Sequence, residues 1–188
     1  MRPVQDYQKI NAITIRNQYP LPLIVDLIRD LSNAHIYTKL DVRWGYNNVR
    51  IREGDEKKAA FKTRYGLFKP TVMYFGLTNS PATFQTMMNY IYWDVILKHK
   101  PLGTTIHVYM DDIGIATCTT LDDHRRAVQD ILQVAQLHDL YFKLEKCLFH
   151  SSSMDYLGVI LEKGVTCMDP AKIAGVDVWL IPKSAMEV

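Results

Sequence analysis

The chain has 188 residues, of which 48% are hydrophobic and 22% are charged, and its formal net charge at pH 7 is +2. This composition is typical of one folded domain and excludes bulk disorder, a collagen-like chain and a pure linker. No stretch approaches the ~20 apolar residues of a membrane span. The three cysteines form no CxxC pair, which favours a reducing compartment over a disulfide framework.

The first half of the chain predicts short elements separated by loops. The breaker at 19–22 precedes a short helix. Residues 36–42 predict a strand, and residues 48–52 predict another extended segment. Residues 59–65 and 69–74 predict the two arms of a hairpin. The short helix has an apolar face made of Leu23, Leu27, Ile28 and Leu31.

The middle of the chain predicts a long helix followed by two strands. Ser80 is a suitable N-cap and Pro81 a suitable first residue for a helix that runs to about residue 97. Two β-rich runs at 105–109 and 113–118 then predict a hairpin with acids at its tip. The long helix has an apolar face made of Phe84, Met88, Ile91 and Val95.

The last elements complete a recognisable order. Residues 122–137 predict a second amphipathic helix, and residues 154–161 predict a final strand pair. The order strand, helix, strand, strand, helix, strand predicts an α+β fold with a ferredoxin-like split βαβ sheet. Many functions use this arrangement, so the fold alone does not assign one. The inward face of the second helix is expected to consist of Val128, Ile131, Leu132 and Ala135.

Three acids are the most informative residues. Asp111 and Asp112 lie between the two β-rich runs, where paired acids are ordinarily solvated turn residues. Their neighbours offer no residue that suits a left-handed turn, so the pair is poorly chosen for a plain hairpin. Asp41 ends the strand at 36–42, with a helix N-cap as its alternative role. If the strands are neighbours, three carboxylates converge, and two divalent cations about 3.5–4 Å apart would neutralise them and catalyse phosphoryl transfer.

The same residues carry a family resemblance. The sequence Tyr109-Met110-Asp111-Asp112 resembles the YMDD box of reverse transcriptases. Further blocks resemble the family in the same order, at 37–46, 75–85, 145–147, 156–158 and 168–172. Together they identify the chain as similar to gypsy-type long-terminal-repeat retrotransposon polyproteins, from which it departs at Trp44, in place of a small residue.

The resemblance implies a right-hand polymerase palm with helices on one face of its sheet, partial fingers and the start of a thumb. The whole of 1–188 is then a reverse transcriptase domain. The fingers and palm junction would comprise 1–35 and 48–78, the palm 36–47 and 79–162, and a truncated thumb 163–188. The other parts of the fingers, the thumb and the RNase H part of a parent polyprotein are expected to be missing.

The resemblance also implies an activity and a metal site. The activity is RNA-directed DNA polymerase, a two-metal transfer of dNTPs to the 3′-OH of a primer on an RNA or DNA template. Asp41, Asp111 and Asp112 match the catalytic, metal-binding acids of the family, and the backbone carbonyl of Val42 is a further ligand. The cofactors would be two Mg²⁺ ions, with Mn²⁺ possible.

Other positions match the nucleotide and primer sites of the family. Tyr46 matches the steric gate against ribonucleotides, with a packed aromatic as its alternative. Phe75 and Gly76 match the floor of the nucleotide site. Arg2 matches an arginine that contacts the triphosphate and Lys146 a lysine that protonates pyrophosphate, although each could be a plain surface residue. Leu157 and Gly158 match the primer grip, with an ordinary turn as the alternative.

Basic residues are candidates for the backbone of the primer and template, with a solvated basic face as the alternative. Two other functions stay open, a catalytically inactive nucleic-acid-binding remnant of a decayed element and a structural module. The expected location is intracellular and reducing, in a cytoplasmic virus-like particle or the nucleus, without a membrane partner. The basic candidates are Arg50, Arg52, Lys57, Lys58, Lys62 and Arg64.

Overall fold

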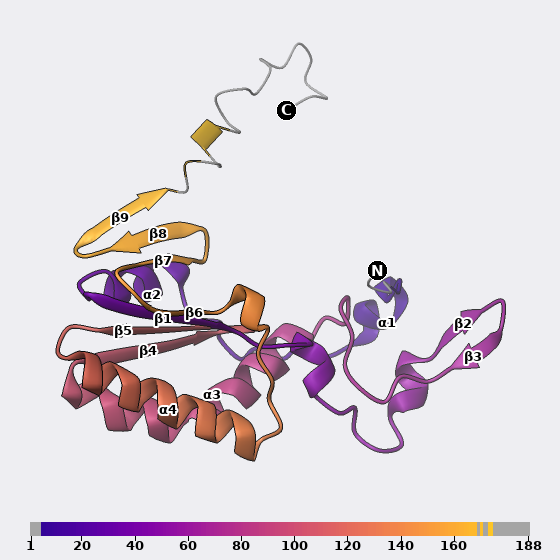
Figure 1. The fold of residues 1–188 in the computed structure, drawn as a ribbon. Coiled ribbons are helices and arrows are strands. Elements are labelled where there is room, and N and C mark those ends of the chain that lie inside the picture. The colour runs from indigo at the N-terminus through magenta and orange to yellow at the C-terminus, as the bar shows by residue number, and fades with distance from the viewer. Residues whose placement is uncertain (1–4, 169, 171–172, 175–188) are drawn as a thin grey trace, which may run out of the picture.

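A four-stranded antiparallel sheet forms the centre of the computed structural model, which describes residues 5–168, 170 and 173–174. Its strand order is β4-β5-β1-β6, and every neighbouring pair is antiparallel. With one long helix between β1 and β4 and another between β5 and β6, this is the predicted split βαβ arrangement (Figure 1). The strands are β1 (Ile36–Asp41), β4 (Thr104–Tyr109), β5 (Asp112–Thr117) and β6 (Leu148–Ser151).

Two long helices, α3 (Ser80–His99) and α4 (Leu121–Leu137), cover one face of this sheet (Figure 1). The apolar face of α3 is buried as predicted, and Phe84 and Met88 are fully buried in the core between helices and sheet. On α4, Ile131 is fully buried in the same core. Burial of such a side chain stabilises the fold by about 1.5–3 kcal/mol. The regularly spaced apolar side chains that predict the helices therefore also stabilise their packing on the sheet.

Three details of these helices differ from prediction. The N-cap of α3 is Asn79, and Ser80 is the first helical residue, with its hydroxyl donating to Tyr74 O at 3.1 Å. Leu132 is 38% exposed and does not face inward. His124 is fully buried instead, because it lies one helical turn before the buried Val128 on the same face of α4, which begins one residue earlier than predicted, after a capping box formed by Thr120 and Asp123. Because histidine is polar, the sequence pattern did not predict that residue 124 is buried.

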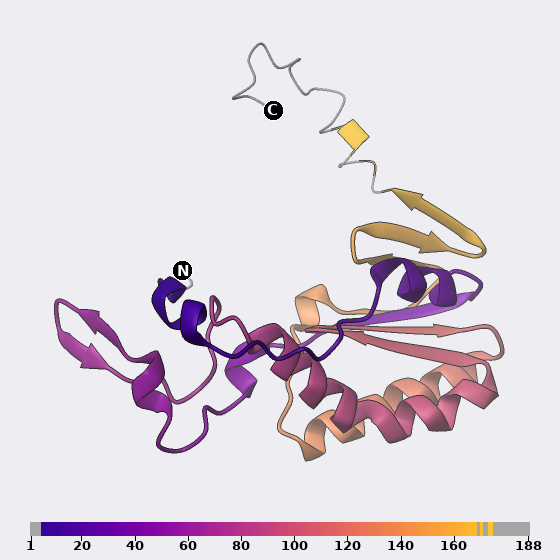
Figure 2. The same cartoon turned by 180° about the vertical axis from the view of Figure 1, so that it is seen from behind.

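The other face of the sheet carries a second layer. Helix α2 (Ile24–Leu31) and a three-stranded sheet of β7 (Ser153–Tyr156), β8 (Val159–Glu162) and β9 (Val165–Met168) lie there (Figure 2). "Helices on one face" therefore holds for the two long helices and not for α2. A methyl group added at Gly114 would lie 3.0 Å from the ring of Tyr156 and 3.2 Å from Leu31, so the layers meet at bare backbone.

The strand pair predicted at 154–161 is present, but it does not provide the fourth strand of the central sheet. Residues 154–161 form the hairpin of β7 and β8 in the second sheet, and β6 takes the edge position beside β1. The pairing is irregular, with partners Tyr37 to Ser151 and Lys39 to Leu148. Leu148 and Phe149 are 36% and 41% exposed, so β6 lacks the alternation of buried and exposed residues that marks a strand in sequence.

A less compact region projects beyond one end of the central sheet (Figure 2). It contains α1 (Gln8–Ile13), which sequence analysis missed, and the short hairpin of β2 (Phe61–Thr63) and β3 (Gly66–Phe68). The hairpin is shorter than predicted, and its second arm precedes residues 69–74 because the turn lies at 64–65. Residues 48–52 form no strand; Arg50 and Val72 share a single bridge. The short 3₁₀ helices are η1 (Gly45–Asn48), η2 (Glu56–Ala59), η3 (Lys100–Leu102) and η4 (Leu144–Lys146).

Within the described residues, no helix is long and apolar enough to cross a membrane. Arg2 and most of the predicted thumb segment lie outside the described residues. Of that segment, β9 pairs with β8 as the last strand of the second sheet.

Candidate active site

The predicted acids meet at one end of the central sheet, which we call the acid end and define by Asp41, Asp111 and Asp112. Asp41 is the last residue of β1 and lies directly opposite Asp112, the first residue of β5. Opposed residues in an antiparallel pair point to the same face, with Cβ atoms about 4.5–5.5 Å apart. Asp111 is joined to the same place by its carbonyl, which accepts from Val42 N at 2.7 Å. Three carboxylates therefore share one edge.

Asp111 reaches this position through a strained turn. Tyr109 pairs with Asp112, so Met110 and Asp111 form a two-residue loop, and Met110 has a φ of 55°. Positive φ at the first loop residue alone is the pattern of a type II′ turn, which ordinarily uses glycine there. A side chain in this region costs about 1 kcal/mol or more. The poor turn chemistry expected from the sequence is thus present in the backbone.

A buried glutamine of α3 holds the turn in place. The Gln85 side chain is fully buried; its Oε1 accepts from Met110 N at 2.8 Å and its Nε2 donates to Val108 O at 2.9 Å. Nε2 also donates to Asn89 Oδ1 at 2.8 Å, and Asn89 Nδ2 donates to the Tyr19 hydroxyl at 2.7 Å. Gln85 acts as a positioning residue for Asp111, because it fixes the backbone on both sides of Tyr109.

The electrostatic environment of Asp112 is that of a crowded acid. Burial raises the pKa of its carboxyl above the usual value, and the negative charges of Asp111 and Asp41 raise it further. Lys39, whose Nζ lies 4.0 Å from Asp112 Oδ1, opposes the rise. A buried acid whose pKa is raised by its environment is a recurring property of catalytic sites.

Asp41 is neutralised by two lysines. Lys143 Nζ pairs with Asp41 Oδ1 and also lies 3.5 Å from Val42 O, whereas Lys146 Nζ lies 3.6 Å from Asp41 Oδ2. In the part of the chain that the structure describes, no three His, Cys, Asp or Glu side chains are gathered as a metal cluster. The donor set still fits a hard divalent cation, because it consists of oxygens and two of them already hold a cation, the Lys143 ammonium.

A cavity of about 300 Å³ opens beside Asp111. Phe75 forms part of its wall, and the ring of Tyr46 lies 4.8 Å from the ring of Phe75 and 5.7 Å from that of Phe84. Burial, together with the negative charge of Asp111, raises the pKa of the Tyr46 phenol. Tyr46 is thus both a packed aromatic and a neighbour of the acids. The residues that line the cavity are Trp44, Gly45, Asn47, Tyr74, Phe75, Asp111 and Lys143.

The loop of Phe75 and Gly76 is fixed by the missed helix α1. Asn11 Nδ2 donates to Gly76 O at 2.7 Å, and Asn11 Oδ1 accepts from Thr78 N at 2.9 Å. Gly76 has a φ of 98°, and a Cβ there would lie 3.3 Å from Gln5 O. The glycine is therefore needed both for its backbone conformation and for the close approach of the preceding segment.

Leu157 and Gly158 form the two-residue turn between β7 and β8, each with positive φ, 50° and 86°. This is the type I′ pattern of a tight hairpin. The adjacent Tyr156 is fully buried, and burial together with the negative charge of Asp112 raises the pKa of its phenol. The β7–β8 turn therefore lies on the same side of the second sheet as the acid end of the central sheet (Figure 1).

The six basic candidates are all exposed and lie in the projecting region, in the loops and hairpin around η2. Two of them are engaged with acids of the same segment: Arg50 with Glu56 at 3.1 Å and Lys58 with Asp55 at 2.7 Å. Ion pairs at a surface are weak, so these side chains stay available to a polyanion.

Sequence reasoning missed Gln85 and Lys143 at this site. Gln85 carried a weak signal, a polar residue next to the predicted buried face of a helix. Lys143 carried none, because its place depends on how the chain after α4 pairs with the end of β1.

Comparisons with known proteins identify related sequences and structures. The family model described as "Reverse transcriptase (RNA-dependent DNA polymerase)" matches residues 1–161. The Transposon Tf2-3 and Tf2-7 polyproteins of Schizosaccharomyces pombe are each 36% identical over 190 residues, which cover the whole chain and 14% of each polyprotein. The chain therefore spans about a seventh of these relatives.

Solved structures with the same fold come from a foamy virus. Its protease-reverse transcriptase in complex with an RNA/DNA hybrid has a TM-score of 0.85 and 18% identity, over 98% of this chain and 24% of that one. The complex of a dRH form with double-stranded DNA has a TM-score of 0.87 and 17% identity, over 97% and 31% of the two chains. At this identity the likeness establishes the fold.

Proposed function

The chain belongs to the reverse transcriptase family, and from this premise we propose that it catalyses RNA-directed DNA synthesis as a domain of a retrotransposon polyprotein. The observation that supports this most strongly is the convergence of Asp41, Asp111 and Asp112 beside a cavity at one end of the sheet. The reaction is attack of the 3′-oxygen of a primer on the α-phosphorus of a dNTP, with release of pyrophosphate.

The three carboxylates and the carbonyl of Val42 would hold two divalent ions. The chemistry that Mg²⁺ or Mn²⁺ supplies when bound is activation of the primer hydroxyl and neutralisation of charge on the triphosphate. The protein orients these groups: β1 and β5 fix Asp41 and Asp112 opposite each other, and Gln85 fixes the turn that presents Asp111. Positioning and charge account for most of the catalysis in such reactions.

The remaining site residues have roles toward the nucleotide and the primer. Tyr46 and Phe75 would contact the sugar and base of the dNTP, next to the Gly76 backbone. Arg2 and Lys146 would act on its phosphates. Leu157 and Gly158 would contact the primer, since their turn lies on the same side of the second sheet as the acid end of the central sheet.

Nucleic acid is the proposed macromolecular partner. The foamy viral enzyme of the same fold forms complexes with an RNA/DNA hybrid and with double-stranded DNA, and we propose both as partners of this chain. The exposed basic residues of the projecting region would contact the phosphates, which makes binding dependent on salt. Fingers, thumb and RNase H parts of a longer polyprotein would complete the grip, in an intracellular, reducing compartment such as a virus-like particle or the nucleus.

Primer extension on an RNA template with Mg²⁺ tests the proposal. Replacing Asp111→Asn removes a negative charge from the acid end without changing shape, and we expect extension to fall about a thousand-fold, equivalent to about 4 kcal/mol in the barrier. Asp139→Asn is the matched control, since Asp139 is exposed after α4 with a φ of 53°, which asparagine tolerates. Equal extension by wild type and Asp111→Asn contradicts the proposal. Binding of primer–template without extension identifies the nucleic-acid-binding alternative.

A further inference from the structure

We infer that Lys143 is a tethered cation that occupies the position of a divalent ion at Asp41 and must leave before the ion binds. The inference rests on the proposed function, because it takes Asp41 and Val42 as ligands of the ion. It adds a residue that sets how much metal the enzyme requires.

The backbone places Lys143 beside Asp41. The segment 141–143 runs antiparallel to the chain at the end of β1, where Val42 and Phe142 share a bridge. Lys143 N donates to Asp41 O at 2.9 Å, and Arg43 N donates to Tyr141 O at 2.6 Å. Lysine and aspartate are thus cross-strand neighbours, so their proximity follows from main-chain hydrogen bonds and not from a chance rotamer.

The ammonium contacts two of the four groups that are expected to hold metal. It pairs with the carboxylate of Asp41 and lies 3.5 Å from the carbonyl oxygen of Val42. Both side chains are largely shielded from water, with exposures of 19% for Lys143 and 12% for Asp41. At such shielding the attraction is stronger than at a surface, so the ammonium is a real competitor for these oxygens.

Lys146 does not compete in the same way. Its Nζ lies 3.6 Å from the other oxygen of Asp41, and its side chain is 57% exposed. No contact with the Val42 carbonyl is recorded among the described residues. Lys143, in contrast, also lines the cavity beside Asp111. The displaced ammonium can therefore turn into that cavity, and metal binding needs only a side-chain movement.

The expected effect follows from population arithmetic. If the ammonium occupies the site in about nine molecules of ten, the apparent dissociation constant for metal is raised about ten-fold. Removing the charge of Lys143 while keeping its apolar stem should therefore lower the apparent dissociation constant about ten-fold. Replacing Lys143 with another positively charged side chain should leave the dissociation constant nearly unchanged.

Direct Mn²⁺ binding, without nucleotide or nucleic acid, tests the inference. Free Mn²⁺ is measured by electron paramagnetic resonance during titration of the protein. Lys143→Met should lower the dissociation constant about ten-fold relative to wild type, and Lys143→Gln should do the same if the methionine variant folds poorly. Lys143→Arg should stay within about two-fold of wild type.

Two further variants make the result specific. Lys163→Met removes one charge from the turn between β8 and β9, at the opposite end of the sheet from Asp41, and should leave the dissociation constant unchanged (Figure 1). Asp41→Asn should abolish the binding that Lys143→Met strengthens. Equal affinities in wild type and both uncharged variants, with binding lost in Asp41→Asn, overturn the inference and leave the proposed function intact. Absence of Asp41-dependent binding in every protein overturns the inference and the proposed metal site together.

Discussion

The two ends of the central sheet differ in the polar groups that they carry, although β1 and β5 contribute to both. At the acid end, β1 and β5 present charged carboxylates that are only partly neutralised by lysines. At the other end, which we call the threonine end, the same strands bury a network of neutral polar groups. The threonine end is defined by Thr38, Thr104, Thr117 and His124.

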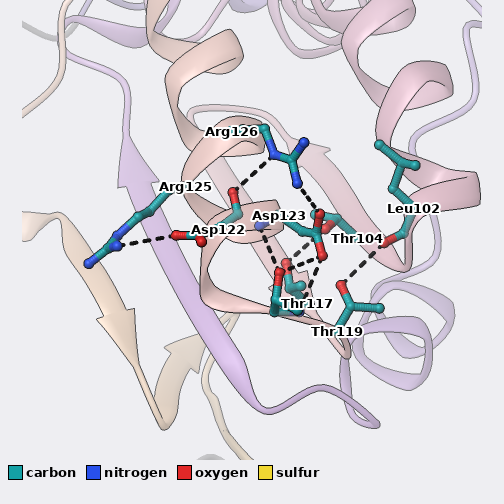
Figure 3. Close-up of polar contacts among 9 residues, drawn as sticks. Leu102, Thr104, Thr117, Thr119, Asp122, Asp123, Arg125 and Arg126 are labelled. Carbon is teal, nitrogen blue, oxygen red and sulfur yellow. Dashed lines mark hydrogen bonds and ion pairs between the residues drawn. The ribbon is translucent and has the colours of Figure 1, made fainter.

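The threonine end is fully paired. His124 Nε2 shares a hydrogen bond with the Thr38 hydroxyl and Nδ1 one with the Thr117 hydroxyl, each at 2.8 Å. Thr117 is also 2.9 Å from Thr104 (Figure 3), and Thr38 accepts from His150 N at 3.1 Å. Burial, assisted by the nearby His150, lowers the pKa of His124 to about 4, so the ring is neutral at pH 7. A satisfied network of this kind stabilises one arrangement of the core.

The difference teaches where this fold places its stability and where it places its reactivity. Neutral hydrogen bonds can be completed within the protein, so the threonine end needs no ligand. The negative charges of converging carboxylates cannot be balanced in the same way. The chain pairs them with lysine side chains, which an incoming cation can replace. The carboxylates thus lie at the end of the sheet that also contains the strained backbone of Met110 and the replaceable ammonium of Lys143.

The largest effect that we predict on folding stability is at the link between the acid end and α3. Gln85→Leu leaves Met110 N and Val108 O without their partner, and we expect a loss of about 2–3 kcal/mol in the free energy of unfolding. Primer extension should fall about 10- to 100-fold, the usual cost of removing a group that orients metal ligands. Urea unfolding and single-nucleotide extension measure the two effects.

Gln133→Leu, an exposed position on α4, is the control and should change neither quantity appreciably. A Gln85→Leu variant that keeps full extension would show that the turn holds Asp111 without help from α3.

The next effect concerns pH and the threonine end. Because the pKa of His124 is about 4 in the folded chain and about 6.5 when unfolded, the unfolded state takes up a proton first as the pH falls. The contribution of His124 to folding stability is therefore present above pH 6.5 and is lost as the pH falls from 6.5 to 4. Between pH 6 and 4.5 the loss from this group should be about 2 kcal/mol.

Urea unfolding at a series of pH values measures this loss. His124→Gln should flatten the dependence in that window, whereas His138→Gln, at an exposed histidine at the end of α4, should leave it as in wild type. Identical slopes in wild type and His124→Gln would contradict a neutral buried imidazole.

The smallest effect is at the cap of α4, beside the threonine end. Thr120 Oγ1 accepts from Asp123 N at 3.1 Å, and Figure 3 shows Asp123 and the arginine pair around this helix start. Thr120→Ala should cost about 1 kcal/mol in the free energy of unfolding without change in Mn²⁺ binding. Thr120→Ser keeps the hydroxyl and should restore most of that stability. An altered metal affinity in Thr120→Ala would show that the two ends are coupled.

Sequence reasoning predicted the elements whose signal is local. The periodicity of α3 and α4 and the β-rich runs around Asp111 specified the sheet and its helices, because burial on one face leaves a regular pattern. The position of the acids beside the predicted strands indicated the residues of the acid end, and the family resemblance added their expected roles. Their convergence could be expected once Asp41 and Asp112 were placed on neighbouring strands.

Elements without a periodic pattern were missed. Helix α1 buries no residue of its own, and its importance lies in Asn11, which reaches the loop of Gly76. Strand β6 is short and exposed, so β7 and β8 were taken for the last strand of the central sheet. Lys143 and His124 are fixed by contacts between segments about 86 or more residues apart, which no local signal records.

The contact between Gly114 and Tyr156 has a mechanical consequence. Because the ring of Tyr156 packs directly on the backbone of Gly114, the two sheets are in close contact at this point. Asp112 lies two residues away along β5, a separation of about 7 Å. Under the proposed contact of this hairpin with the primer, the packing would couple force from a moving strand of nucleic acid to the acid end.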